Sequence, residues 1–230
     1  MRIDSVVEQF DGLGSRDWRE RLQVSRDLGT GFAAPGGEFT RALFEWSLLP
    51  GGAFLHQLLK GRRVVEIGAG MMPYGYALAA HAGAKNFVAV EPFYADKQEI
   101  AQKAYVEDQL PEHLRIPRKV VEMDILSYLE GEPDDLLCLL ACGIEDCILP
   151  GMDYKLKVER EIGRTLEPEA FFISSHSDLR PGGLIEKEFI FPRPSNPSLT
   201  DRLRIHGGRI AYELSEEFLP EERDLFFFTG

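Results

Sequence analysis

The chain has 230 residues, with 26 Lys and Arg against 38 Asp and Glu, and a formal net charge of −12. This length is enough for one domain with a substantial core, and no apolar run reaches the roughly 18 residues of a membrane helix. The acidic balance disfavours a nucleic-acid partner, because such a protein needs a cationic face to displace counterions.

The N-terminal residues and the cysteines indicate in which cellular compartment the protein is expected. The first eight residues lack the apolar core of a signal peptide. The three cysteines, at 138, 142 and 147, are odd in number and lack Cys-x-x-Cys spacing. We therefore expect a reduced, cytoplasmic protein without a disulfide scaffold, without a metal site and without membrane contact.

Three helices are predicted ahead of the first strand. One starts at Ser15 and stops at Gly29, and a glycine-rich connector follows it. A second begins at Glu38 and carries apolar residues at helical spacing up to Leu49. A short third helix spans residues 54–59. These elements predict an N-terminal helical extension over residues 1–60.

The first strand and the turn after it carry most of the information. The β-branched residues Val64, Val65 and Ile67 suit a buried parallel strand, and Gly68-Ala69-Gly70 follows at once. A helix over residues 73–82 comes next. Strand, glycine turn and helix form the nucleotide corner of a doubly wound α/β fold. A phosphate-binding P-loop is excluded because no Gly-Lys-Ser/Thr follows, and the third glycine of a dinucleotide fingerprint is replaced by Pro73.

Glu66 stands two residues before Gly68. The segment Val-Val-Glu-Ile-Gly-Ala-Gly resembles the first motif of the class I S-adenosylmethionine-dependent methyltransferases. The alternative is any buried strand that ends in a glycine turn. The resemblance implies a mostly parallel, seven-stranded Rossmann-like sheet, here over residues 61–230. It also implies that Glu66 and the Gly68–Gly70 turn contact S-adenosylmethionine.

A second apolar run, residues 86–90, ends at Glu91 and Pro92. Glu91 lies 21 positions after Gly70, close to the roughly 20 expected of a carboxylate that binds ribose hydroxyls. A carboxylate there repels a 2′-phosphate, so an NADP-like ligand is disfavoured. The alternative is a surface glutamate that follows a strand.

A third strand ends at Asp124, and Ile125 follows. In the enzymes that the chain resembles, an acid at this place accepts from the adenine amino group, and the next backbone N–H meets a ring nitrogen. An acceptor-only carboxylate suits that amine. The alternative is that Asp124 caps the helix that begins at Ile125, and both roles can coexist on different oxygens.

A fourth strand ends at Ala141 and Cys142, which should border the methyl donor together with Gly143, Ile144 and Glu145. The Asn/Asp-Pro-Pro-Tyr/Phe tetrad of amino-directed DNA methyltransferases is absent here, and so is the Pro-Cys nucleophile of cytosine methyltransferases. Both absences argue against DNA as the substrate.

The remaining elements complete the sheet. A helix over residues 154–166 and a strand over 167–177 are predicted, with His176 at the strand's end. A terminal antiparallel pair is predicted at 210–214 and 224–229, and the proline-rich stretch 191–197 should be an irregular surface loop.

His176 is the best general base by location, although it can equally be held in the hydroxyl-rich Ser174–Ser177 turn. Glu145 and Asp146 are candidates for binding an amine. Phe39, Arg41 and Trp46 are candidate lid residues, because N-terminal helices often cover the cofactor in the enzymes that the chain resembles. For the two aromatic side chains the competing role is core packing.

The sequence thus predicts a methyltransferase whose acceptor is a small, neutral or cationic molecule. Three alternatives stay open: transfer of the aminopropyl or aminocarboxypropyl group of the same donor, a non-catalytic adenosyl-ligand sensor, and an NAD-dependent oxidoreductase. Nothing in the sequence indicates the oligomeric state.

Overall fold

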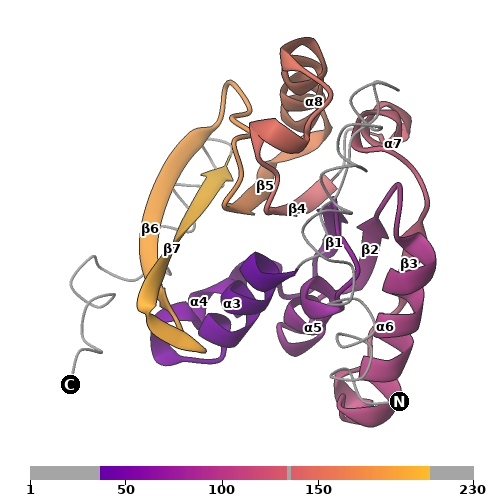
Figure 1. Ribbon diagram of the computed structural model, residues 1–230, viewed down its shortest axis with the longest axis vertical. Helices are drawn as coiled ribbons and strands as arrows, with labels where there is room; N and C mark the ends of the chain where they lie inside the picture. The colour runs from indigo at the N-terminus through magenta and orange to yellow at the C-terminus, as the bar shows by residue number, and fades with distance from the viewer. Residues whose placement is uncertain (1–36, 134–135, 208–230) are drawn as a thin grey trace.

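A computed structural model describes residues 37–133 and 136–207 of the chain. They form one seven-stranded sheet in the order β3-β2-β1-β4-β5-β7-β6 (Figure 1). β1 to β5 are parallel, and β7 runs antiparallel to both of its neighbours. The strands are β1 Arg63–Ile67, β2 Asn86–Val90, β3 Arg118–Val121, β4 Leu136–Cys142, β5 Leu166–Ser175, β6 Ile185–Arg193 and β7 Asn196–Gly207.

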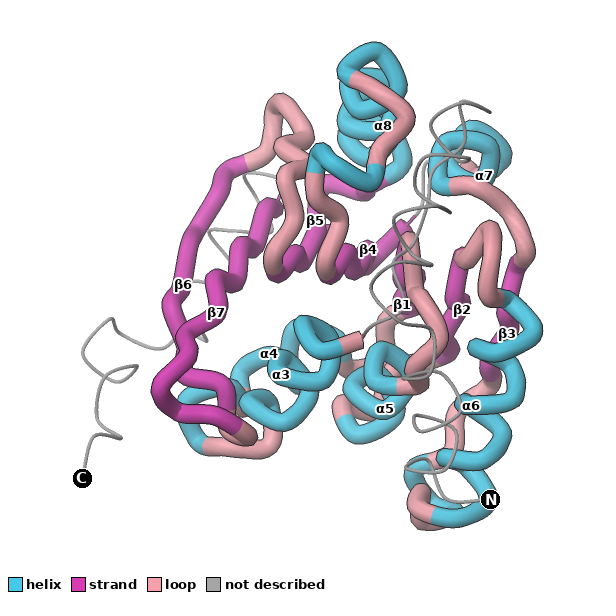
Figure 2. Tube along the Cα trace, in the orientation of Figure 1, coloured by secondary structure: helices cyan, strands magenta, loops and turns pink. Residues whose placement is uncertain are grey.

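Helices cover both faces of this sheet, as Figure 2 shows. α3, α4 and α5 pack on one face, and α7 and α8 pack on the other. The mostly parallel, doubly wound architecture predicted from the sequence is therefore confirmed. The helices are α3 Glu38–Ser47, α4 Phe54–Leu59, α5 Tyr74–His81, α6 Ala95–Asp108, α7 Ile125–Gly131 and α8 Met152–Thr165, with 3₁₀ turns η1 Pro50–Gly52, η2 Glu112–Leu114 and η3 Asp146–Ile148.

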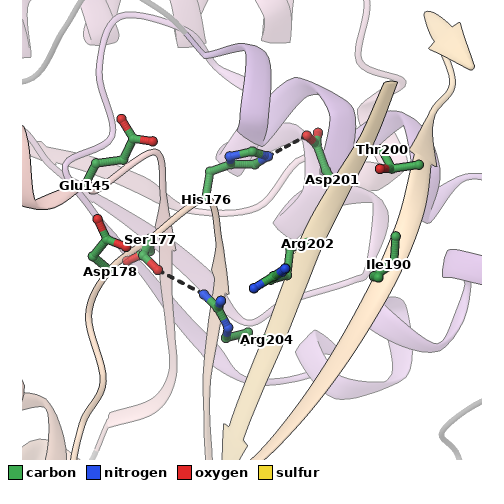
Figure 3. Close-up of a pocket in the computed structure, with 9 residues that line it drawn as sticks. All are labelled: Glu145, His176, Ser177, Asp178, Ile190, Thr200, Asp201, Arg202 and Arg204. Atoms are coloured by element: carbon green, nitrogen blue, oxygen red, sulfur yellow. Dashed lines mark hydrogen bonds and ion pairs between the residues drawn. The ribbon is translucent and has the colours of Figure 1, made fainter. Parts of the chain in front are cut away.

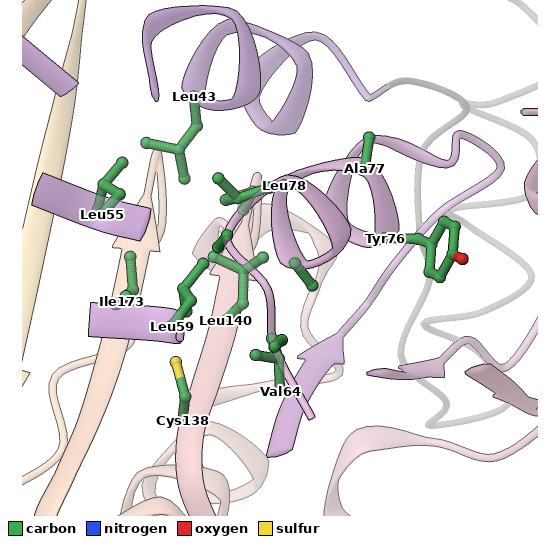
Figure 4. Packing of buried hydrophobic residues seen from close by; sticks show 14 of the residues in the cluster. Leu43, Leu55, Leu59, Val64, Tyr76, Ala77, Leu78, Cys138, Leu140 and Ile173 are labelled. Atoms are coloured by element: carbon green, nitrogen blue, oxygen red, sulfur yellow. The ribbon is translucent and has the colours of Figure 1, made fainter. Parts of the chain in front are cut away.

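The core on the α3–α5 face is built from alternating strand residues and the apolar stripes of those helices (Figure 4). In β1, Val64 points to this face, whereas Val65 points to the α7–α8 face, as the two-residue period of a strand requires. Leu43 of α3 and Leu55 of α4 are fully buried in it. The described part of the predicted N-terminal extension is thus packed against the sheet.

The last two strands differ from the sequence-based prediction. The proline-rich stretch 191–197 is not an irregular loop: it forms the tip of the β6–β7 hairpin. Pro192 is tolerated because β6 is an edge strand, where a missing backbone N–H need not break the ladder, and the register shifts at Pro192/Arg193. The antiparallel partner of β5 is therefore β7, at residues 196–207.

Several predicted elements lie outside the described residues. They are the helix from Ser15 to Gly29, most of the connector after it, and the strands at 210–214 and 224–229. In the parts of the chain that are described, no helix is both long and apolar enough to span a bilayer.

Candidate functional site

The glycine turn joins β1 to the segment before α5. Gly68 and Gly70 have φ values of 63° and 65°, in the left-handed region that side chains with a Cβ rarely adopt. The Ala69 N–H donates to the Val90 carbonyl at 3.1 Å, which ties the turn to the end of β2. The turn therefore lies at the carboxyl edge of the sheet, where open α/β folds bind ligands.

Glu66 lies beneath this turn with 1% of its surface exposed. Thr40 Oγ1 of α3 donates to its Oε1 at 3.3 Å, and Oε2 finds no hydrogen-bond partner in the described structure. A side chain at Gly75 would overlap this carboxylate, so the glycine gives it room. Burial raises the pKa of Glu66 to about 8; the Thr40 hydrogen bond offsets this in part, and the charge of Glu91 adds to it. Glu66 is thus mainly protonated at neutral pH.

Glu91, directly after β2, is completely buried. Its carboxylate accepts the backbone N–H groups of Gly70 at 2.8 Å, Phe93 at 2.8 Å and Tyr94 at 3.2 Å. Burial raises its pKa to about 7, against the lowering effect of these three hydrogen bonds. In this conformation Glu91 holds the glycine turn in place. Its ribose-binding role requires the carboxylate to be uncovered and stays a prediction, as does the role of the adjoining Pro92.

Asp124 caps α7, as the alternative interpretation of the sequence has it. Its Oδ1 accepts the Ser127 N–H at 3.1 Å and the Tyr154 hydroxyl at 3.0 Å. Burial opposes ionisation, but these hydrogen bonds outweigh it and lower the pKa of Asp124. Tyr154 of α8 also accepts the Leu126 N–H at 3.2 Å, a link between α7 and α8 that the sequence analysis missed. Asp124 is half-buried, and the neighbouring Ile125 is buried.

The ends of β4 and β5 are joined by backbone hydrogen bonds. Gly143 N–H donates to the Ser175 carbonyl at 2.9 Å, and Asp178 N–H donates to the Ile144 carbonyl at 2.8 Å. Ala141 and Cys142 are buried just before this junction. Burial, and then the neighbouring Glu66, raise the pKa of the Cys142 thiol, so it is not a thiolate nucleophile.

A pocket of about 310 Å³ opens beside this junction, between the end of β5 and the β6–β7 hairpin (Figure 3). It brings together the two predicted catalytic residues, Glu145 and His176. Asp146 does not line it, and its carboxylate pairs with Lys155 at 2.8 Å. The pocket is lined by Glu145, His176, Ser177, Asp178, Ile190, Thr200, Asp201, Arg202 and Arg204.

His176 is held by a partner that the sequence analysis did not anticipate. Its Nε2 lies 2.6 Å from Oδ1 of Asp201, a side chain of β7 that is fully buried. Arg193 Nε lies 2.9 Å from both carboxylate oxygens of Asp201. Arg193 belongs to the proline-rich stretch predicted to be irregular, and Asp201 follows it. Only the register of the hairpin brings them to His176.

The candidate lid residues have three different environments. Phe39 stacks on the His176 ring with centroids 4.0 Å apart, so it reaches the pocket wall. Trp46 is 4% exposed and stacks on Phe191 in the core. Arg41 forms an ion pair with Glu45 of the same helix at 2.7 Å.

Comparison with known proteins gives likenesses only among solved structures. No family model and no curated protein matches the chain. MtNAS in complex with MTA and tNA is 18% identical, with 74% of this chain and 69% of that chain covered and a TM-score of 0.48. A SAM-dependent methyltransferase from Agrobacterium tumefaciens is 13% identical, covering 72% and 60%, with a TM-score of 0.46. Precorrin 8W decarboxylase from Methanobacterium thermoautotrophicum is 16% identical, covering 67% and 85%, with a TM-score of 0.43.

Proposed function

We propose that this protein is an S-adenosylmethionine-dependent methyltransferase that acts on an oxygen or nitrogen nucleophile of a small molecule. The observation that carries the proposal is the position of the His176–Asp201 pair in a pocket at the carboxyl edge of the sheet. The glycine turn, Glu91 and Asp124 follow β1, β2 and β3 at the same edge. In open α/β sheets ligands bind in the crevice outside this edge.

The donor would be held by the residues that follow the first four strands. Asp124 is half-buried, and its carboxylate can accept hydrogen bonds in addition to the one that caps α7. This suits an adenine amino group, which is a donor. The unpartnered Oε2 of the neutral Glu66 suits a polar group at the turn. Glu91 fits the ribose only after it releases Gly70 N–H. The proposed donor-binding residues are Glu66, Gly68, Ala69, Gly70, Glu91, Pro92, Asp124, Ile125, Ala141 and Cys142.

The bound donor supplies an electrophilic methyl group on a sulfonium. The protein then has to align the acceptor with that methyl group and remove its proton. We assign the second task to His176, which lines the pocket and whose side chain is 31% exposed. Glu145, at the exposed rim, would orient the acceptor.

The pocket favours a small acceptor that is neutral or cationic. Its volume of about 310 Å³ lies at the lower end of the range for small-molecule sites. Its two arginines, Arg202 and Arg204, lie 3.4 and 2.7 Å from carboxylate oxygens of Glu188, which neutralises part of their charge. The carboxylates of Glu145 and Asp178 line the same pocket.

We expect the purified protein to bind S-adenosylhomocysteine more tightly than NAD. Pro73 stands where a dinucleotide fingerprint has its third glycine, and Glu66 precedes the turn. Isothermal titration calorimetry with both ligands measures the difference. Tighter binding of NAD would contradict the proposal. Donor binding without turnover of any acceptor would identify a sensor instead.

We further expect label from a tritiated methyl donor to enter low-mass metabolites when the protein is incubated with a fractionated cell extract. The small volume of the pocket, about 310 Å³, and the formal net charge of −12 are the reasons. Label found mainly in RNA or DNA would show that the substrate class is wrong. Release of methylthioadenosine in place of S-adenosylhomocysteine would identify aminopropyl or aminocarboxypropyl transfer.

A further inference from the structure

The His176 ring is fixed by contacts from three elements of the fold. Asp201 of β7 contacts Nε2, and Phe39 of α3 stacks on one face of the ring at 4.0 Å with an interplanar angle of 23°. Arg193 of β6 lies over the Phe39 ring, 5.2 Å from its centroid, and binds Asp201. Each of these four residues thus contacts two of the others, and His176 and Asp201 line the pocket.

The backbone of His176 is also held in an unfavourable conformation. Its φ of 47° is the only positive value among the non-glycine residues that the structure describes. Such a conformation is strained in a residue with a Cβ and persists where surrounding contacts enforce it. The hydrogen bonds between the loops after β4 and β5, on either side of residue 176, are those contacts.

We propose that Asp201 is a positioning residue that keeps the proton of neutral His176 on Nε2 and leaves the lone pair of Nδ1 to accept the proton of the acceptor. This inference rests on the proposed function. Figure 3 shows Asp201 and Glu145 on opposite sides of the His176 ring, with Nδ1 on the side away from Asp201. Both of these acids line the pocket.

The protonation pattern follows from donors and acceptors. An ionised carboxylate only accepts hydrogen bonds, and the guanidinium Nε of Arg193 lies 2.9 Å from both oxygens of Asp201. A neutral imidazole that contacts such a carboxylate through Nε2 must donate from that atom. The proton is therefore absent from Nδ1, which becomes the free base.

In the reaction, the acceptor's O–H or N–H bond breaks and its proton goes to Nδ1 of His176. The freed electron pair forms the new bond to the methyl carbon. The carbon–sulfur bond breaks at the same time, and sulfur keeps its electrons. His176 leaves the step as an imidazolium that donates from both nitrogens, and Asp201 at 2.6 Å stabilises its charge.

Nitrogen NMR of ¹⁵N-histidine-labelled, ligand-free protein tests the assignment. At a pH where His176 is neutral, we expect Nε2 to be protonated and Nδ1 unprotonated. His176 Nε2 and Arg193 Nε both contact Oδ1 of Asp201. In Asp201→Asn the group at this place loses its negative charge, so we expect the preference for a proton on Nε2 over Nδ1 to weaken. A wild-type His176 with its proton on Nδ1, or an unchanged pattern in a folded Asp201→Asn protein, would overturn the proposal.

A matched control lies on the same hairpin. His206 Nε2 contacts the carboxylate of Glu186 at 2.9 Å, so Glu186→Gln removes an equal charge from another histidine pair. It should shift the His206 nitrogens and leave those of His176 unchanged. If it alters His176 as much as Asp201→Asn does, the Asp201 effect is a general charge effect.

Kinetics adds a second readout. Loss of a correctly oriented base should lower kcat of Asp201→Asn by about 10²- to 10⁴-fold, with little change in KM. A rise in KM with unchanged kcat would assign Asp201 to acceptor binding and refute the positioning role. Because the tautomer is measured without donor or acceptor, a wild-type protein without transferase activity would contradict the proposed function and leave the tautomer test intact.

Discussion

Raising the pH from 5 to 9 is expected to lower the free energy of unfolding of the wild-type protein more than that of Glu66→Gln. The expected difference between the two proteins is on the order of 3–5 kcal/mol, because one pKa unit corresponds to about 1.36 kcal/mol. Burial raises the pKa of Glu66 to about 8 in the folded protein, against 4.5 as its ordinary value. Between these two pH values the folded state binds the proton and the unfolded state does not. Stability contributed by the protonated carboxyl is therefore present at pH 5 and is lost as the pH rises to about 8.

The measurement is urea unfolding of both proteins at pH 5, 7 and 9. At pH 5 the two should differ by about 1 kcal/mol or less, because glutamine is close in shape to a protonated glutamate. Glu107→Gln, on the exposed face of α6, removes the same charge and should follow the wild-type curve. Parallel curves for wild type and Glu66→Gln would show that Glu66 ionises in the folded protein at ordinary pH.

Local patterns in the sequence are sufficient to predict much of the fold and the glycine turn after β1. β1 and β2 appeared as apolar runs, and the two glycines with positive φ were identified from their place after β1. The capping role of Asp124 follows from an acid before an apolar helical stretch, so it too was available as an alternative. Each of these features depends on residues within about one turn or strand of each other.

The pocket around His176 depends on pairing between distant segments. Asp201 meets His176 because β7 inserts beside β5, with Ser175 opposite Leu203. A shift of one residue in that register would turn Asp201 to the other face. Prolines at 192, 194 and 197 suggested an irregular loop, since the sequence does not show that β6 is an edge strand. The burial of Glu91 was missed for a related reason: its three partners are backbone N–H groups, which any sequence supplies.

Glu91→Gln is expected both to destabilise the protein and to abolish its preference for a ribose. Glu91 accepts N–H groups on both carboxylate oxygens, from Gly70 on one side and from Phe93 and Tyr94 on the other. A glutamine amide accepts on one side only. At least one buried N–H then loses its partner, at a cost of roughly 1–3 kcal/mol. Thermal unfolding of wild type and variant measures this part.

The binding part of this prediction compares adenosine with 2′,3′-dideoxyadenosine by calorimetry. If Glu91 grips the ribose, wild type should prefer adenosine by at least about tenfold, since each hydrogen bond to a charged group contributes roughly 1.5–3 kcal/mol. Glu91→Gln should lose most of that preference. A loosened glycine turn alone would lower the affinity for both nucleosides by the same factor, so equal losses of affinity would refute the ribose contact. Because burial raises the pKa of Glu91 to about 7 and hydroxyl donors favour the ionised carboxylate, the wild-type preference should grow between pH 6 and pH 8.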